Sequence, residues 1–252
     1  MSQVPASSLV PVAPVAPVMR PARRIGVLGH ALREREYARR VLRALGVAPL
    51  VFTSVDELTA LGDDMARLNL LFLGDAPPTD REGEVALPPG VLSSIGSKLV
   101  QLAHADSGTA PTRHLRARPP MQPPSFDDFY RDILLVLQAR GLGCATPKPL
   151  TWGAYSFQPL ERSVSFAGRT RRLDPVTFDL ALEFFFNAER LLSLARLRRM
   201  MNPVRGARRF WGNELIGTLT DVADELELHG AHGWRLVHCE PEAFRLDREA
   251  VP

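Results

Sequence analysis

The stretch LDPVTFDLALEFFFNAERLLSLARLRRMMN, residues 173–202, decides the fold of this chain. Its pattern predicts two successive helices, at 175–188 and 193–202. A third helix is expected at 214–228, where one stripe of apolar residues recurs at intervals of three and four. That stripe consists of Leu215, Leu219, Val222 and Leu226.

Short strands flank these helices. Residues 150–174 are typical of antiparallel strands with a turn at Ala167–Gly168, and residues 233–247 of two strands meeting at a turn around Glu240–Glu242. A small sheet, three helices and a final hairpin describe a winged helix-turn-helix. We therefore predict an α+β domain of this kind over residues 150–248.

Strands and helices alternate in the N-terminal half, which predicts a parallel sheet with helices on both faces. The run 68–74 is apolar without alternation, as expected of a strand that is covered on both sides. Residues 106–124 contain several prolines and no periodic segment. The predicted strands are 23–29, 48–54, 68–74 and 97–105, and the predicted helices are 30–46, 55–68 and 125–141. This flavodoxin-like α/β domain would span residues 23–141, with a linker at 142–149.

The composition describes a globular chain, with 45% hydrophobic and 23% charged residues among 252. The net charge of +3 is too small to indicate nucleic acid by itself. Two cysteines, Cys144 and Cys239, fit a reducing compartment, and no apolar run approaches the roughly 18 residues of a membrane span. We expect a cytoplasmic protein without membrane contact. Its residues 1–22 would form a disordered or polyproline-like tail, with a short docking segment as the alternative.

Motifs around the helical stretch match a known family. The form L-x-P-x-E-F-x-L-L begins the family's first helix, S-R-x-x-L begins its second, and I-x-T-V-R-G-x-G-Y-R-L forms its wing. The matching residues are Leu173, Pro175, Phe178 and Leu180, then Ser193 and Leu197, then Leu236, Phe244, Arg245 and Leu246. This pattern resembles the effector domain of OmpR/PhoB-type response regulators, and the N-terminal half looks like their receiver domain. The resemblance covers about 23–247 and implies a two-component transcription regulator that dimerises and binds promoter DNA.

In that family, a receiver is phosphorylated on an Asp at the end of its third strand. Mg²⁺ is held by that Asp and by an acidic pair after the first strand. Here the pair falls on Gly29 and His30, and the acceptor position on Gly74, so none supplies a carboxylate. Asp75 lies one residue late, where a strand end turns its side chain to the other face; a shifted site there is the alternative. We predict a pseudo-receiver with no phosphoacceptor, metal or cofactor, which signals by dimerisation or partner binding.

The helix at 214–228 corresponds to the family's recognition helix, whose Arg or Lys residues contact phosphates and guanine edges in the major groove. Residues 213–252 hold three basic and nine acidic residues, hence a formal net charge of −6. Because DNA carries one negative charge per about 1.7 Å, such a surface opposes the usual pose. The outward positions of the helix are expected to be Thr218, Thr220, Asp221, Ala223 and Asp224.

Positive charge gathers instead at 190–209, which contains seven arginines and no acid. A solvated Arg-rich face is one interpretation, and contact with phosphates or with an acidic protein is the other. The residues expected to contact nucleic acid or a partner are Arg198, Arg199, Arg205, Arg208, Arg209, Trp211 and Arg245, together with Thr218, Thr220, Asp221 and Asp224.

Two functions follow, with a slight preference for the first. In the first, the chain is a phosphorylation-independent regulator that binds promoter DNA in a non-standard way. In the second, it is an adaptor that does not bind DNA and acts on RNA polymerase or another regulator. The adaptor would use the acidic helix and the Arg-rich loop.

One cluster near the C-terminus has the residue types of a zinc site: His229, His232, His238 and Cys239. Its spacing matches no common site, so we predict no bound metal. The sequence contains no nucleophile–base pair, Gly-rich phosphate loop or paired acid motif. We therefore expect that the protein is not an enzyme.

Overall fold

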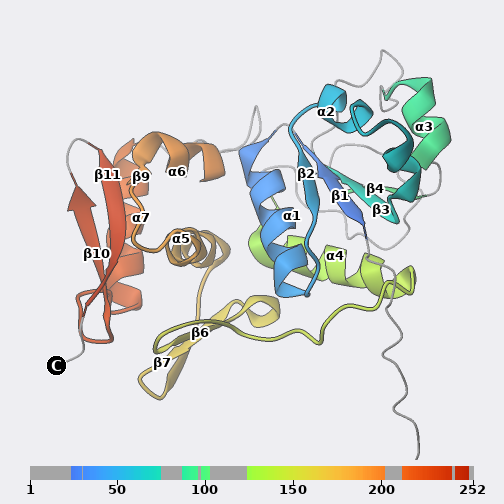
Figure 1. Cartoon of the computed structure of the whole chain (residues 1–252). Helices are drawn as coiled ribbons and strands as arrows, with labels where there is room; N and C mark the ends of the chain where they lie inside the picture. The colour runs from blue at the N-terminus through green and yellow to red at the C-terminus, as the bar shows by residue number, and fades with distance from the viewer. Residues whose placement is uncertain are drawn as a thin grey trace, which may run out of the picture.

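The structure is a computed structural model that describes residues 24–29, 31–74, 87–95, 98–102, 124–201, 212–239 and 242–249. It has two halves, which Figure 1 shows in blue to green and in yellow to red. No helix within these ranges is long and apolar enough to cross a membrane.

The N-terminal half is a parallel sheet covered by helices, as predicted. The strand order is β2-β1-β3-β4, and all neighbouring pairs are parallel. The strands are β1 (Ile25–Leu28), β2 (Leu50–Phe52), β3 (Leu70–Leu73) and β4 (Leu99–Gln101). The helices are α1 (Leu32–Ala44), α2 (Val55–Thr59), α3 (Pro89–Ile95) and α4 (Phe126–Ala139), with a 3₁₀ helix η1 (Gly62–Arg67). The α/β fold class is confirmed.

Neighbouring residues of the central strands face opposite sides of the sheet. Val27 and Phe72 pack with α1 and α4, whereas Leu28 and Leu71 pack with α2, η1 and α3. Both faces are therefore covered, which explains why every residue of β1 and β3 is buried.

The helix ends follow from local sequence with small corrections. Ser54 caps α2, since its side chain accepts a hydrogen bond from the Glu57 N–H at 3.2 Å. Helix α1 is shorter than the predicted 30–46. Leu45 takes the C-cap position, and Gly46 follows it with a φ of 79°, a conformation that favours glycine.

The C-terminal half contains the predicted small sheet, three helices and hairpin. The sheet order is β5-β6-β7-β8, all antiparallel, and Ala167 and Gly168 form the predicted turn with φ values of 47° and 73°. Its strands are β5 (Leu150–Trp152), β6 (Tyr155–Gln158), β7 (Ser163–Phe166) and β8 (Arg169–Arg172), with a 3₁₀ helix η3 (Pro159–Glu161). The helices are α5 (Pro175–Phe186), α6 (Leu194–Met201) and α7 (Gly212–Glu225). This is the winged helix-turn-helix arrangement, so the predicted fold class is confirmed here too.

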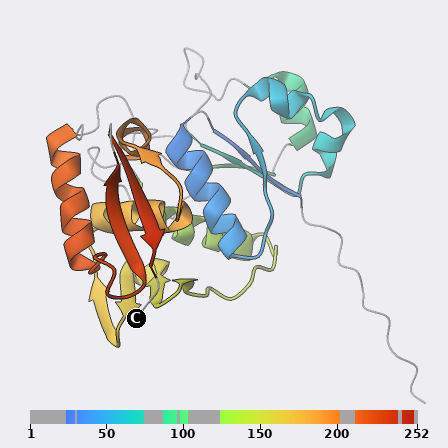
Figure 2. The same cartoon turned by 60° about the vertical axis from the view of Figure 1, so that its left-hand side comes forward.

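The terminal hairpin has one strand more than expected. β10 (Trp234–Cys239) pairs with β11 (Ala243–Arg248), which also pairs with β9 (Leu192–Ser193). The second helix of the bundle was predicted from residue 193, but Ser193 is extended because it pairs with Ala243. The Ser193 Oγ accepts from the Arg196 N–H at 3.2 Å. Figure 2 shows the hairpin beside α7.

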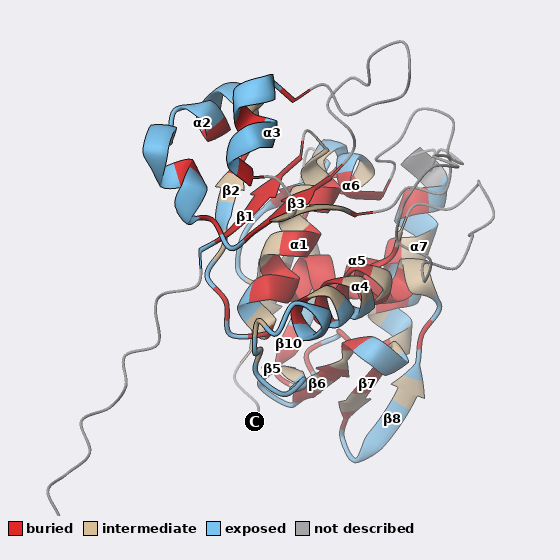
Figure 3. Ribbon diagram, turned by 90° about the vertical axis from the view of Figure 1, so that its right-hand side faces the viewer, coloured by how far each residue is buried: buried red, intermediate tan, exposed pale blue. Residues whose placement is uncertain are grey.

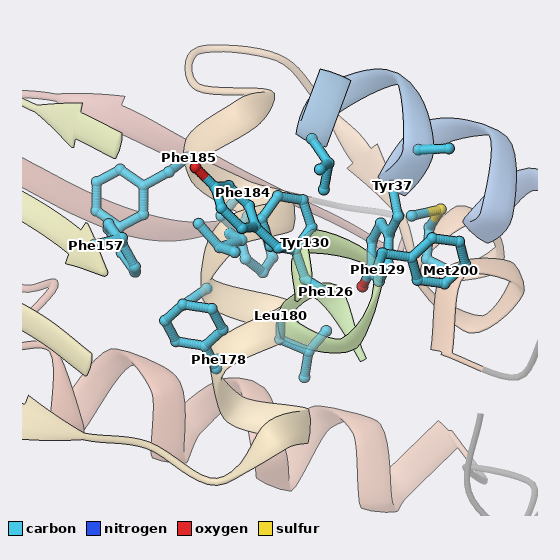
Figure 4. Close-up of a cluster of buried hydrophobic side chains, with 14 of the residues drawn as sticks. Tyr37, Phe126, Phe129, Tyr130, Phe157, Phe178, Leu180, Phe184, Phe185 and Met200 are labelled. Atoms are coloured by element: carbon cyan, nitrogen blue, oxygen red, sulfur yellow. The ribbon is translucent and has the colours of Figure 1, made fainter. Parts of the chain in front are cut away.

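Helix α5 lies at the centre of the molecule, between the sheet half and the hairpin (Figure 1). Every residue from Thr177 to Phe185 is buried, so the helix is covered on all sides. One hydrophobic cluster runs from Ile25 in β1 to Leu246 in β11. Figure 4 shows side chains of α1, α4 and α5 meeting inside it. The predicted linker also packs, since the Ala145 N–H donates to the Leu45 carbonyl at 3.0 Å.

Candidate functional site

The carboxyl edge of the parallel sheet holds the positions where the family carries its acidic residues. Gly29 and Gly74 directly follow β1 and β3 and are both buried. A Cβ on Gly74 would lie 3.2 Å from the Gly29 Cα, closer than most real side chains come. The two strand ends thus approach so closely that side chains would crowd them. His30 and Asp75, the other predicted residues of this edge, lie outside the described residues.

A carboxylate that the sequence prediction missed fills this edge. Glu34 is 2% exposed, and a Cβ on Gly74 would overlap its Oε2. The same oxygen is 3.8 Å from the position of a Cβ on Gly29. Glu34 therefore occupies the space beside Gly74 where a longer side chain would extend. The available signal was an acidic residue in the first turn of the helix that follows β1.

The neighbouring residue, Arg33, makes the main polar contact between the two halves. It is buried and forms an ion pair with Asp179 of α5. It also donates to the Met200 carbonyl at 2.8 Å and to the Pro124 carbonyl at 3.0 and 2.9 Å. One guanidinium thus satisfies acceptors from α5, α6 and the residue preceding Ser125 at the start of α4.

A second buried ion pair lies two turns further along α1. Arg40 Nη1 is 2.5 Å from Glu183 Oε2, and both side chains are almost fully buried. Arg196 of α6 reaches the other oxygen of Glu183 at 3.3 Å. Glu183 therefore ties α1 and α6 to the same side of α5.

Aromatic rings surround these charges. The Arg33 guanidinium lies 4.6 Å from the Tyr37 ring centroid, and that of Arg40 lies 4.7 Å from the Phe186 ring. Tyr37 meets Phe126 edge-to-face at 5.3 Å between centroids (Figure 4). The contact between the halves is thus mainly apolar, and its buried charged groups are surrounded by aromatic rings.

Burial affects the ionisation of this contact. It raises the pKa of Asp179 to about 6, although Arg33 and the Phe126 N–H, which Asp179 accepts at 3.0 Å, act in the opposite direction. The sequence signal for the contact was the presence of Asp179 and Glu183 inside an otherwise apolar helix, and the prediction did not use it.

Helix α7 presents the acidic face that the sequence predicted. Its apolar stripe is fully buried, while Thr220, Asp221 and Asp224 are exposed. Thr218 is half-buried, and Ala223 is half-buried against the core, so the prediction that Ala223 points outward was wrong. The two threonine hydroxyls donate to carbonyls of their own helix, at 2.9 Å for Thr218 and 3.2 Å for Thr220.

Two arginines on the hairpin, Arg235 and Arg245, are paired with carboxylates, whereas Arg248 at the end of β11 is exposed. Arg245 Nη2 lies 2.9 Å from Asp247 Oδ2, and Arg235 Nε lies 2.8 Å from Glu249 Oε1. The hydrogen bonds that Arg245 donates to the Asp247 carboxylate raise the pKa of Arg245 above its ordinary value. Arg245 therefore offers little free charge to a polyanion.

The predicted arginines of the bundle fall into two groups. On α6, Arg199 is exposed and Arg198 is half-buried. Arg205, Arg208 and Arg209, and with them the predicted Trp211, lie outside the described residues.

The histidines near the hairpin have separate partners. His229 Nε2 lies 3.1 Å from Asp224, and His232 Nε2 lies 2.8 Å from Glu227. His238 stacks on Phe244 with 4.8 Å between centroids. In the part of the chain that the structure describes, no three His, Cys, Asp or Glu side chains gather as metal ligands would.

Solved structures that resemble this chain include two proteins related to response regulators. One is the response regulator DrrB, a Thermotoga maritima OmpR/PhoB homologue, at 12% sequence identity. The other belongs to a family of streptococcal redox sensors that evolved from two-component response regulators, at 10% identity. Each comparison covers 89% of this chain and 99% or 100% of the other, with a TM-score of 0.36. No protein-family model and no curated protein matches the chain.

Proposed function

We propose that this chain is a transcription regulator of the OmpR/PhoB-like kind whose receiver-like half works without phosphorylation. The sequence motifs of 173–202 and the order of the two halves support the regulator role. The observation that carries phosphorylation independence is the position of Glu34 beside Gly74. An acceptor side chain at Gly74 would overlap this carboxylate.

The chemistry of the edge supports the same conclusion. Phosphoryl transfer needs an accessible carboxylate as acceptor and oxygen ligands for Mg²⁺. Gly29 and Gly74 supply neither, and Glu34 is buried, where a phosphoryl donor cannot reach it.

A thermal shift experiment tests this part of the proposal. The full chain is melted with and without Mg²⁺ plus beryllofluoride, an analogue of a phosphoryl group bound to a carboxylate. A ligand that binds only the folded state raises Tm. We expect no change, and a Mg²⁺-dependent rise in Tm would contradict the proposal.

For the effector-like half, we propose contact with another protein rather than insertion of α7 into DNA. Asp221 and Asp224 are exposed on that helix. Arg235 and Arg245 of the adjacent hairpin are neutralised by local carboxylates. DNA affinity depends mainly on unpaired positive charge at phosphates, so this surface is poorly suited to a duplex. The partner would be RNA polymerase or another regulator with a basic surface.

A second candidate is DNA contact through α6 instead of α7. The observation in its favour is Arg199, an exposed cation on a helix whose described residues include no acid. This mode would place phosphates against α6 instead of against α7.

Binding of a labelled DNA duplex across a salt series separates the two candidates. If α7 serves a protein partner, we expect no measurable binding even at low salt. If α6 contacts phosphates, log K falls steeply with log salt, and Arg199→Ala weakens binding. Arg172→Ala, which removes an exposed arginine from strand β8, is the matched control.

A further inference from the structure

We propose that helix α1 couples the carboxyl edge of the parallel sheet to the effector-like half. A change at Gly74 and Glu34 would then alter helices α5 and α6. The coupling is a property of the chain itself, whichever partner the effector-like half binds.

Three consecutive residues in the first turn of α1 make the connection. Glu34 lies against Gly74, and Arg35 Nη1 donates to the Gly29 carbonyl at 2.8 Å, so this turn is fixed to the ends of β1 and β3. Arg33 extends to the other half and pairs with Asp179. Consecutive helical residues point in different directions, which allows one turn to contact both sides.

The contacts of Arg33 reach three elements of the structure. They are Asp179 in α5, the Met200 carbonyl in the last turn of α6, and the Pro124 carbonyl before α4. Each of these acceptors is held by the same guanidinium. A shift of Arg33 therefore breaks or moves its hydrogen bonds to Asp179 and Met200 in the effector-like half together with those to Pro124 before α4.

This contact has little freedom to absorb a displacement. Arg33 and Asp179 are both nearly fully buried, and close-packed interiors transmit strain instead of relaxing locally. A buried ion pair cannot separate without leaving an uncompensated charge. Arg40 and Glu183 repeat the contact two turns later, so α1 is held to α5 along its length.

The effector-like helices can pass the change on to the acidic face. Helix α7 packs on α5, and Met200 lies near the end of α6. Both helices that Arg33 contacts therefore support the bundle that presents Asp221 and Asp224.

Hydrogen exchange of the full chain tests the coupling. Gly74→Ala places a methyl group where it overlaps Glu34 and must displace it. We expect backbone exchange to become at least about tenfold faster in α1, in α5 and at the end of α6, but not in the β10–β11 hairpin. Gly90→Ala is the matched control, since a Cβ at Gly90 of α3 meets nothing within 4 Å.

The role of Arg33 is tested by repeating the substitution in an Arg33→Met background. If Arg33 carries the coupling, Gly74→Ala no longer changes exchange in α6 there, and the two substitutions are non-additive. Glu34→Gln, which keeps the shape and removes the charge, serves if Gly74→Ala does not fold. Faster exchange confined to the sheet half, or an equal rise in the hairpin, would overturn the proposal.

Discussion

The two faces of the parallel sheet are covered in different ways. On one face, Val27 and Phe72 pack under α1 and α4, and these helices are themselves covered by α5. On the other face, Leu28 and Leu71 pack under α2, η1 and α3, whose outer sides are exposed (Figure 3). The first face leads into a core shared by both halves, and the second ends at solvent.

The charges on the two faces differ in the same way. Arg33–Asp179 and Arg40–Glu183 are buried at the first face. On the second, the Arg67–Asp64 pair has both side chains more than half exposed. Buried pairs lose much when one partner is removed, whereas exposed pairs contribute little. The first face should therefore bind the halves together, while the second should tolerate substitutions.

The largest effect is expected from Arg33→Ala. It leaves the buried Asp179 carboxylate and Met200 carbonyl, and the partly buried Pro124 carbonyl, without the guanidinium, which costs about 3–5 kcal/mol of unfolding free energy. Urea unfolding followed by tryptophan fluorescence and by circular dichroism measures it. All three tryptophans lie after residue 149, so fluorescence reports the effector-like half.

Arg39→Ala is the control for this substitution. Arg39 lies on the same helix and pairs with the partly exposed Glu36, so its loss should cost less than about 1 kcal/mol. If Arg33→Ala costs as little as Arg39→Ala, or leaves the fluorescence transition in place, the first face does not hold the halves together.

The next largest difference in stability is expected between two substitutions that create a cavity, one on each face of the sheet. Phe126→Ala removes a fully buried ring of the shared core and should cost about 3–5 kcal/mol, lowering the fluorescence midpoint as well. Leu58→Ala, also fully buried but on the second face, should cost nearer about 2 kcal/mol. Its effect should be larger by circular dichroism than by fluorescence. Equal effects on both signals would remove the distinction between the faces.

A smaller effect is expected from pH at the first face. Burial raises the pKa of Asp179 to about 6 from 3.8, so between these values the folded chain binds a proton that the unfolded chain has lost. The contribution of the Asp179 carboxyl group to the free energy of unfolding is therefore largest below pH 3.8. It falls as the pH rises to about 6 and is constant at higher pH. The free energy of unfolding, measured with denaturant at a series of pH values, should fall less between pH 3.8 and about 6 in Asp179→Asn than in the wild type. The same dependence of unfolding free energy on pH in the two proteins would contradict the prediction.

The smallest effect is expected at the second face, from Glu57→Gln. The Thr53 N–H and hydroxyl donate to the Glu57 carboxylate at 2.6 and 2.7 Å and lower its pKa. The stabilisation is present above pH 4.5, the ordinary value, and is lost as pH falls through the lowered pKa. Thermal melts from neutral to acid pH should show a gap between the variant and the wild type that closes on acidification. A gap that stays constant would argue against the prediction.

Most of the fold was predictable because it depends on local pattern. The apolar runs of β1 and β3 indicated strands covered on both faces, and the stripe from Leu215 to Leu226 indicated one buried face of a helix. An error occurred where the local conformation depends on a residue far away in the chain. Ser193 was predicted to be helical but is extended, because it pairs with Ala243. The absence of carboxylates at Gly29 and Gly74 was also readable. The sequence showed that Glu34 is an acidic residue in the first turn of the next helix, but only the structure shows that its carboxylate lies beside Gly74.

By itself, the sequence determined the fold class of both halves, the acidic character of α7 and the order of most elements, α3 and β9 excepted. Side-chain period and residue charge are local properties, and they do not depend on where other segments lie. Only the tertiary structure decided that α5 is buried against both halves, with Asp179 and Glu183 matched to Arg33 and Arg40 of α1. The physical reason is that a charge inside an apolar helix becomes acceptable only when a specific opposite charge is brought to it. That partner lies more than 140 residues away in the chain.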